Sequence, residues 1–551
     1  MKSADNEKMG LFSCVVLIIG SCIGSAIFSI SGITIWYAGP SAIVSWFLAA
    51  AIYCLFGLIV TKLALRYPQS GGLYVFPRCS MGGRAGEFFG FISAWGNIIS
   101  TILAIGFSSI FLGIFLQVGF PSIDDPLAMS LLSLSLASCV LFSGLRSSRV
   151  VHNTLVISIL AMIVCYCCVA LFSGSFDISN FNGFFVKGAK GGGGFISAVP
   201  LAMVAYGGSI FVAYLAADVK RPERNIRLSF FLGLGTVALI YIALIATIIG
   251  TLPLEVLAED ESVRYIPVFA SITSGNLSRF PWLLKVVSIC GAVALFSSVI
   301  AMMRVCSKNI QAVSAAGLLP AMFSKRDSKG VLSISILFLT LCGGALCFFS
   351  DHVDVMLTLG AVLSIVTITI TCISEMFARR RAALFPLSVT VLLWACFIPD
   401  ILHGSFKMWN FTVAVYVAGL VVYGLCRKLV RVRMTGTVVH SKGKGHLHGM
   451  PTANIESQEG QPLPGYGVWA TRVRIGDRLY KGVTNVGLRP SDDDSRRPSV
   501  ETLILDFDED IYGKEITLEF VRFLRNTMKF DNLDQLRLQI DKDIERAMGV
   551  L

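Results

Sequence analysis

Charged residues are scarce in this 551-residue sequence, where they make up only 15% of the chain against 54% hydrophobic residues. A wholly water-soluble protein is therefore not expected. The apolar residues fall in long runs until about residue 429, and a run of roughly 20 apolar residues is long enough to cross a bilayer as a helix. The sequence predicts a multi-pass α-helical membrane protein with a soluble C-terminal tail.

The tail has no cysteine and no excess of basic residues. All 15 cysteines precede residue 430, mostly in apolar runs where cysteine behaves as a small hydrophobe, so no disulfide framework is expected. Residues 434–551 carry 16 Lys/Arg against 18 Asp/Glu, which argues against nucleic acid as a partner. The tail therefore has a net charge of −2, and residues 1–433, with 30 Lys/Arg against 17 Asp/Glu, carry +13, which gives the total of +11.

About twelve segments are expected to span the lipid bilayer, near residues 10–37, 40–63, 86–117, 126–144, 151–173, 195–217, 228–250, 283–306, 332–350, 354–377, 383–399 and 408–429. Basic residues gather in every second connecting loop. The positive-inside rule then places both termini in the cytoplasm of a plasma-membrane protein. The centres of the spans lack Asp, Glu, Lys and Arg, which favours a uniporter, an exchanger or sodium coupling over a proton relay.

Two spans are interrupted by small residues, the first and the sixth, so that the second break comes five spans after the first. Broken helices in corresponding positions indicate two inverted five-helix repeats, with a binding site where the breaks meet. Close helix packing by small residues is the alternative. The candidate residues for the transported solute are Ser21, Cys22, Ile23 and Gly24 in the first span and Tyr206, Gly207 and Gly208 in the sixth.

Three stretches make residues 10–430 resemble the amino-acid permeases of the amino acid–polyamine–organocation superfamily. They are residues 20–28 (GSCIGSAIF), 67–74 (YPQSGGLY), and 206–208 (YGG) followed by 218–226 (DVKRPERNI). The resemblance implies that the first break receives a substrate carboxylate and the sixth its amino group. Cys22 and Ala26 stand where such permeases usually have glycine.

The tail has the two-residue periodicity of β-strands. Two strands are expected within residues 466–485 around a turn at 475–478, and further strands at 500–507 and 515–523. Leu533, Leu536, Ile540 and Ile544 would share one face of a closing helix. The tail of about 118 residues is large enough for a small β-barrel domain.

A glycine-rich stretch, residues 443–454 (GKGHLHGMPTAN), opens the tail. Glycines let backbone amides approach a phosphate, and nearby basic and hydroxyl side chains can neutralise charge or bind a metal ion. The pattern does not fit the P-loop sequence G-x-x-x-x-G-K-[ST], so alone it is weak evidence for nucleotide binding.

Several motifs in order make residues 431–551 resemble the ATP-dependent riboflavin kinase domain: residues 435–440 (TGTVVH), the glycine-rich stretch, 467–469 (GVW), 485–490 (NVGLRP), 500–507 (VETLILDF) and 512–513 (YG). The resemblance implies ATP and Mg²⁺ as cofactors, riboflavin as substrate and FMN as product. It also implies a catalytic base, Glu501, and a metal-binding hydroxyl, Thr452. The nucleotide-binding residues would be Gly443, Lys444, Gly445, Gly449, Thr452 and Asn454.

Two domains are therefore expected, a transporter at residues 1–430 and a flavin kinase at 431–551. One hypothesis joins them: the membrane domain admits riboflavin, and phosphorylation traps it as FMN. The alternative is a transporter of amino acids or other small solutes whose tail senses flavin or nucleotide. A third possibility is two independent activities in one chain.

Overall fold

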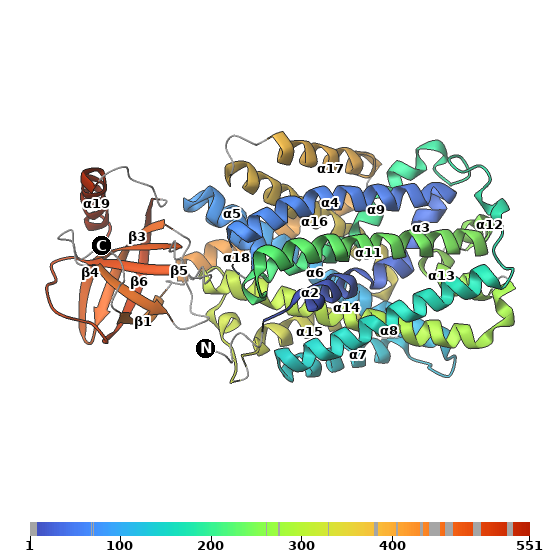
Figure 1. Cartoon of the computed structure of the whole chain (residues 1–551), viewed down its shortest axis with the longest axis horizontal. Coiled ribbons are helices and arrows are strands. Elements are labelled where there is room, and N and C mark those ends of the chain that lie inside the picture. Colours follow the sequence, from blue (N-terminus) through green and yellow to red (C-terminus); the bar gives the residue numbers. More distant parts are fainter. Residues whose placement is uncertain are drawn as a thin grey trace.

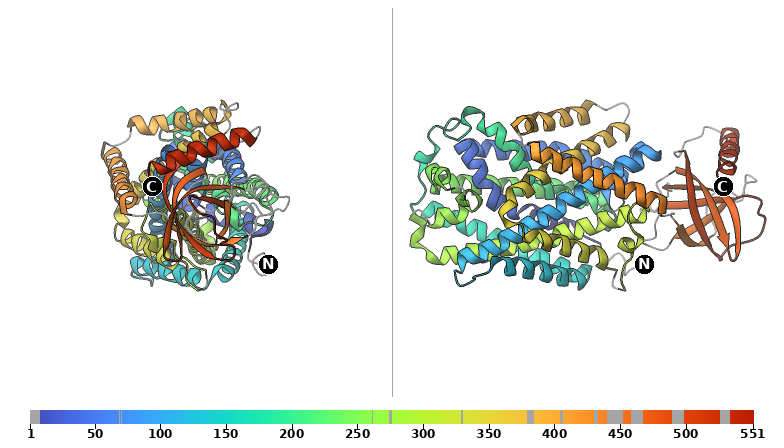
Figure 2. Two further views of the ribbon diagram at one scale, coloured as in Figure 1. Left: turned by 90° about the vertical axis from the view of Figure 1, so that its left-hand side faces the viewer. Right: turned by 180° about the vertical axis from the view of Figure 1, so that it is seen from behind.

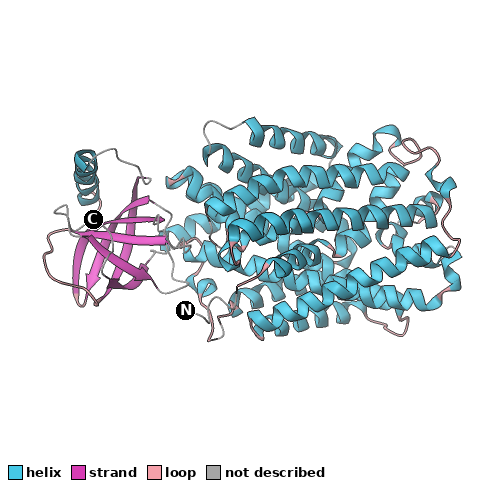
Figure 3. Cartoon of the chain, viewed as in Figure 1, coloured by secondary structure: helices cyan, strands magenta, loops and turns pink. Residues whose placement is uncertain are grey.

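The computed structural model describes residues 8–67, 69, 71–260, 262–273, 276–328, 330–378, 384–403, 406–429, 433–439, 452–457, 467–488, 498–525 and 533–551. A long helical bundle carries a small β-barrel at one end (Figures 1 and 3). Figure 2 shows the barrel end-on, in front of the bundle.

Each of the twelve predicted spans corresponds to a helix or to a broken pair of helices. The first is broken into α2 and α3, and the sixth into α9 and α10. The elements are α2 (Leu11–Cys22), α3 (Ser25–Ala38), α4 (Ala42–Arg66), α6 (Gly83–Gly119), α7 (Pro126–Phe142), α8 (Leu145–Phe172), α9 (Gly194–Ala205), α10 (Phe211–Tyr214), α11 (Pro222–Thr251), α14 (Pro281–Ala315), α15 (Ser333–Cys347), α16 (Val353–Ala378), α17 (Leu384–His403) and α18 (Phe406–Leu429).

Six helices of the described part of the chain are long and apolar enough to cross a membrane, or seven spans if the bent pair 191–205 and 207–214 counts as one. That pair is bent by 45°. The discontinuous helices predicted at both breaks are confirmed, whereas the count of twelve spans stays a prediction. Three short helices in the connections escaped prediction because they are too short to show a clear period: α5 (Gly72–Met81), α12 (Leu254–Glu259) and α13 (Pro267–Thr273).

The helix of the eighth span continues past its predicted end. Lys308 follows the predicted span 283–306, but it lies in α14 with its side chain buried, 3.1 Å from the carboxylate of Asp218. Burial alone would raise the pKa of Asp218. The positive charges of Lys308 and Arg304 together have a larger effect than burial, and they hold this pKa below its ordinary value. The ion pair lets a basic residue stay inside the bundle. Met9 adds a backbone bridge to Val219 beside it.

The tail forms a closed six-stranded barrel in the order β1-β2-β5-β4-β3-β6. Its strands are β1 (Arg433–Val439), β2 (Thr452–Ser457), β3 (Gly467–Ile475), β4 (Arg478–Leu488), β5 (Pro498–Ile504) and β6 (Glu515–Arg525). The predicted turn is confirmed, with Gly476 at φ 57°. β5 ends earlier than expected because the chain turns at Asp506, which has φ 55°.

The closing helix α19 (Leu533–Met548) packs outside the barrel against β3, β4 and β6. Leu536, Ile540 and Ile544 are half-buried, as their shared face predicts. The most deeply buried side chains of the helix are Asp543 and Ala547. Asp543 is buried because Arg525 of β6 contacts both of its carboxylate oxygens.

Candidate functional site

A cavity of about 170 Å³ lies where the two broken spans meet. It is lined by residues of α2, α3, α4, α6, α9, α10, α14 and α16 together with the breaks themselves. No Asp, Glu, Lys or Arg of the described chain lines it. The cavity therefore offers polar but uncharged contacts to a solute.

Five of the seven residues predicted to contact the solute line this cavity, namely Ser21, Cys22, Gly24, Gly207 and Gly208. Ile23 and Tyr206 do not. Both are fully buried behind the cavity wall, and the Tyr206 hydroxyl donates to the backbone oxygen of Trp46 at 3.1 Å. The chain turns at each break and directs these two side chains into the packed core, and their contact with the solute stays a prediction.

Side chains tie the two breaks together. The Ser21 hydroxyl lies 3.1 Å from the backbone oxygen of Gly208. The Cys22 thiol lies 3.8 Å from that of Tyr206. A thiol is a weak donor, and the Ser21 hydroxyl is closer to the backbone oxygen of Leu17 in its own helix, at 2.5 Å, so both contacts across the breaks are secondary. The end of α2 also packs directly against the break of the sixth span at residues 207–210.

Tyr241 of α11 supports both breaks from behind. In a continuous α-helix the backbone amide of Ser209 would donate to the backbone oxygen of Ala205. Here it donates to the backbone oxygen of Tyr206 instead, so the Ala205 oxygen has no such helical hydrogen bond. The Tyr241 hydroxyl lies 3.2 Å from this oxygen and also contacts the backbone oxygen of Cys22. The sequence did not point to Tyr241, because a tyrosine in an apolar helix is usually a packing residue.

Replacing Tyr241 by phenylalanine should destabilise the full chain by about 1–3 kcal/mol, because a buried carbonyl would lose its donor while the ring packing is kept. Thermal unfolding in detergent measures this. Tyr416→Phe is the matched control, because its buried hydroxyl has no hydrogen-bond partner within the described structure. Equal unfolding temperatures for the two variants would contradict the role of Tyr241.

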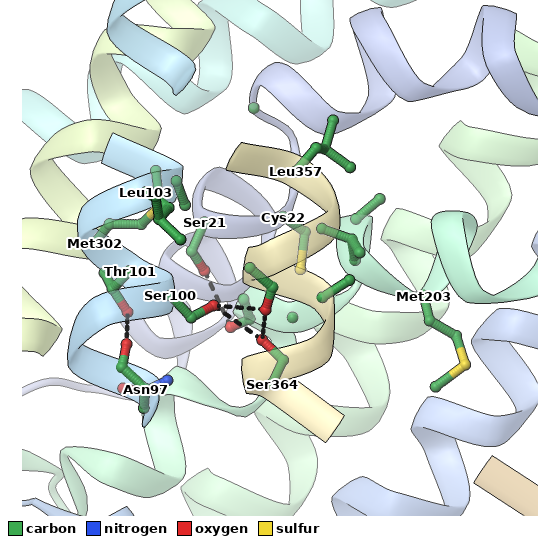
Figure 4. A pocket seen from close by; sticks show the side chains of 18 of the residues that line it. Ser21, Cys22, Asn97, Ser100, Thr101, Leu103, Met203, Met302, Leu357 and Ser364 are labelled. Atoms are coloured by element: carbon green, nitrogen blue, oxygen red, sulfur yellow. Dashed lines mark hydrogen bonds between the residues drawn. The ribbon is translucent and has the colours of Figure 1, made fainter. Parts of the chain in front are cut away.

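Sequence reasoning missed one wall of the cavity, formed by α6 and α16. Its polar side chains are Asn97, Ser100, Thr101, Ser364 and Thr367, and all but Thr367 are labelled in Figure 4. The Ser100 hydroxyl lies 3.0 Å from that of Ser364, which joins the two helices. Small hydroxyl residues within apolar helices look like packing residues, so no pattern in the sequence distinguished them.

In the barrel, three predicted kinase residues lie close together. Asn454 of β2 is directly opposite Glu501 of β5, and Thr452 is opposite Leu503 on the same face. Directly opposed side chains on neighbouring strands have Cβ atoms about 4.5–5.5 Å apart. Their sequence neighbours Ile455 and Val500 point into the barrel core, so this cluster lies on the outer face of the wall.

Asn485 of β4 extends the row, because it is opposite Glu501 on the other side. Asn454 is buried and Glu501 is half-buried. The sequence had placed residue 485 in a motif without giving it a role. The remaining predicted nucleotide-binding residues, Gly443, Lys444, Gly445 and Gly449, lie outside the described residues.

Comparison with known proteins assigns both parts of the chain. Residues 9–426 match the amino acid permease family, and residues 429–551 match the riboflavin kinase family. The protein belongs to the amino acid permease family and carries a C-terminal riboflavin kinase domain. This confirms both resemblances.

Individual relatives match one part or the other. The tail is 33% identical over 115 residues to the bifunctional riboflavin kinase/FMN adenylyltransferase of Bacillus subtilis, which covers 20% of this chain and 36% of that protein. The corresponding Haemophilus influenzae protein is 38% identical over 116 residues, covering 21% and 37%. The chain thus spans about a third of the length of these relatives. A branched-chain amino acid permease of B. subtilis is 26% identical over 343 residues, covering 59% of this chain and 70% of the permease.

Proposed function

We propose that the C-terminal domain transfers the terminal phosphoryl group of ATP to the ribityl hydroxyl of riboflavin, forming FMN and ADP. The observation that carries this proposal is the row of Asn454, Glu501 and Asn485 across three neighbouring strands, with Thr452 one step along. Glu501 accepts the proton of the ribityl hydroxyl as its oxygen attacks phosphorus. Positioning and charge neutralisation supply most of the catalysis in such a transfer.

The residues of this cluster fit Mg²⁺. The ion prefers oxygen ligands, and at sites of phosphoryl transfer it is held by few protein groups together with the phosphates. Thr452 and Asn454 offer a hydroxyl and an amide oxygen on one strand. When bound, Mg²⁺ neutralises phosphate charge. Gly443, Lys444, Gly445 and Gly449 are proposed to bind the ATP phosphates through backbone amides and the lysine ammonium.

The membrane domain is proposed to carry a small, uncharged or zwitterionic solute through the cavity at the two breaks. A cavity of about 150 Å³ holds a molecule the size of benzene, so 170 Å³ suits a solute of amino-acid size. A tricyclic flavin is much larger. The α5 segment, which carries Arg78, lies at the barrel end of the bundle (Figure 1), which supports a cytoplasmic barrel at the plasma membrane.

The test of the kinase is direct. The purified full chain is incubated with riboflavin and Mg-ATP, and FMN is separated by chromatography and measured by fluorescence. Steady formation of FMN supports the proposal. Binding of flavin without turnover would instead favour the tail as a sensor of flavin or nucleotide.

A second candidate function couples the two domains. β1 begins at Arg433, close after the end of α18 at Leu429, so the short connection keeps the kinase near the inner end of the bundle and raises its local concentration there. Riboflavin admitted by the membrane domain would then be trapped as FMN, whose phosphate makes return through the bilayer costly.

Uptake of labelled riboflavin by cells producing the full chain tests this trapping. Accumulation should fall to the background level in a Glu501→Gln variant. Accumulation that does not respond to this substitution would contradict coupled uptake while leaving the kinase activity itself untouched.

A further inference from the structure

The α6–α16 wall, defined by Asn97, Ser100, Thr101, Ser364 and Thr367, gives the cavity a polar region separate from the two breaks. Figure 4 shows Asn97, Ser100 and Thr101 on α6 beside Ser364 on α16. Away from the breaks, the lining also has hydroxyl groups of Tyr53, Ser108, Tyr214 and Ser298, and apolar side chains such as Met203, Met302 and Leu357. The α6–α16 wall therefore holds five of the nine polar side chains that a solute meets away from the breaks.

The hydroxyl protons of this wall are already used. Thr101 donates to the backbone oxygen of Asn97 at 2.7 Å, and Ser364 donates to that of Gly360 at 2.8 Å. Ser100 lies 3.0 Å from the same Gly360 oxygen. A hydroxyl whose proton is donated still has two acceptor lone pairs. The wall thus presents mainly acceptors to the cavity.

Asn97 adds an amide to this wall. Its side-chain oxygen accepts a hydrogen bond from the Asn309 amide at 3.2 Å, and Asn309 is itself buried in α14. This pairing orients the Asn97 amide so that its NH₂ group is the part left for a ligand. The wall can therefore take a ligand group that is mainly a donor and also has one acceptor.

A charged group does not fit here. An ion buried without a partner of opposite charge is strongly disfavoured, and no Asp, Glu, Lys or Arg of the described residues lines the cavity. A purely aliphatic group would displace water from the wall without forming hydrogen bonds to its polar atoms. Leaving these buried polar atoms unsatisfied also costs free energy. A neutral hydrogen-bonding group satisfies both limits.

We propose that the α6–α16 wall selects a solute of amino-acid size whose far end is a neutral carboxamide or hydroxyl, rather than an aliphatic group. This rests on the proposed transport of a small solute at the two breaks and specifies its class. Ser100 and Ser364 determine the preference, because they meet across the two helices that form the wall. A carboxamide offers the two donors and one acceptor that the wall complements.

The experiment uses the full chain in proteoliposomes with labelled L-glutamine and labelled L-leucine. Glutamine should enter with a KM at least about tenfold below that of leucine, since an aliphatic side chain would leave buried polar groups of the wall unpaired. Unlabelled asparagine, serine and threonine should compete better than valine and isoleucine. A preference for leucine would overturn the proposal and leave small-solute transport standing.

Variants separate recognition from folding. The double variant Ser100→Ala/Ser364→Ala should raise the KM for glutamine about tenfold with little change in kcat, and should leave leucine uptake equal or better. Ser109→Ala is the matched control, a buried serine of α6 that donates within its helix and does not line the cavity. A glutamine preference that persists in the double variant would also overturn the proposal. Absence of uptake of every amino acid would refute the proposed transport, and this inference with it.

Discussion

Replacing Glu501 by glutamine is expected to lower the rate of FMN formation by about 10²- to 10⁴-fold, the range that general base catalysis contributes. The amide has the size and most of the hydrogen-bonding capacity of the carboxylate, but it cannot accept a proton. Because Glu501 lies in the middle of a paired strand, between Asn454 and Asn485, the substitution should leave the barrel intact. The measurement is FMN formation by the full chain with saturating riboflavin and Mg-ATP.

The matched control for this prediction is Asp508→Asn, which removes an exposed carboxylate from the segment that follows the same strand. Its rate should equal that of the unmodified chain. Riboflavin binding, followed by quenching of flavin fluorescence, should persist in the Glu501→Gln variant. If that variant bound flavin and turned over at the unmodified rate, Glu501 would not be the base, and another proton acceptor would have to be sought.

The positions of the broken helices could be predicted from sequence because glycine and serine interrupt otherwise continuous apolar runs. Ser21 and Gly24 in one span, and Gly207 and Gly208 in the other, line the cavity as expected. Ile23 and Tyr206 are adjacent in sequence to these residues, but their side chains face the core, which the motif did not indicate. A motif identifies where a chain bends, but the direction of each side chain depends on the local turn.

The strands of the barrel were visible as a period of two, and the motif order placed Thr452, Asn454 and Glu501 in one site. Their register, which makes Asn454 and Glu501 directly opposite, could not be predicted, because β2 and β5 are far apart in sequence. Asn485 was missed for the same reason. It lies beside Glu501 only because β4 pairs with β5 in this register.

Buried charges were the least predictable feature. Lys308 lies just beyond the predicted span 283–306, and Asp543 is not one of the apolar residues predicted to share a face of the closing helix. Both are buried because a partner distant in sequence compensates them, Asp218 in one case and Arg525 in the other. A one-dimensional pattern treats any charge as solvated, and only the tertiary fold shows its partner.

The buried ion pair between Arg525 and Asp543 is expected to contribute strongly to the stability of the barrel. Replacing Asp543 by alanine is expected to destabilise the kinase domain by about 3–5 kcal/mol, the cost of removing one partner of a buried ion pair. Asp543 is 1% exposed and the Arg525 side chain 14%, with nitrogen–oxygen distances of 2.7–2.9 Å. Alanine would leave the guanidinium buried without its carboxylate. The hydrogen bond from Gln539 to Asp543 at 3.1 Å would also disappear.

The measurement is the temperature at which the full chain loses half of its FMN-forming activity after brief heating, expected to fall by more than about 10 °C. Asp541→Ala is the matched control, because Asp541 lies two residues away in α19 with an exposed side chain, and its removal should shift this temperature little. Solute uptake by the membrane domain should survive in both variants, since α19 contacts only the barrel strands β3, β4 and β6 among its principal neighbours. Equal inactivation temperatures for Asp541→Ala and Asp543→Ala would show that α19 is held by its apolar face alone, and that the buried charge pair adds nothing to the stability of the barrel.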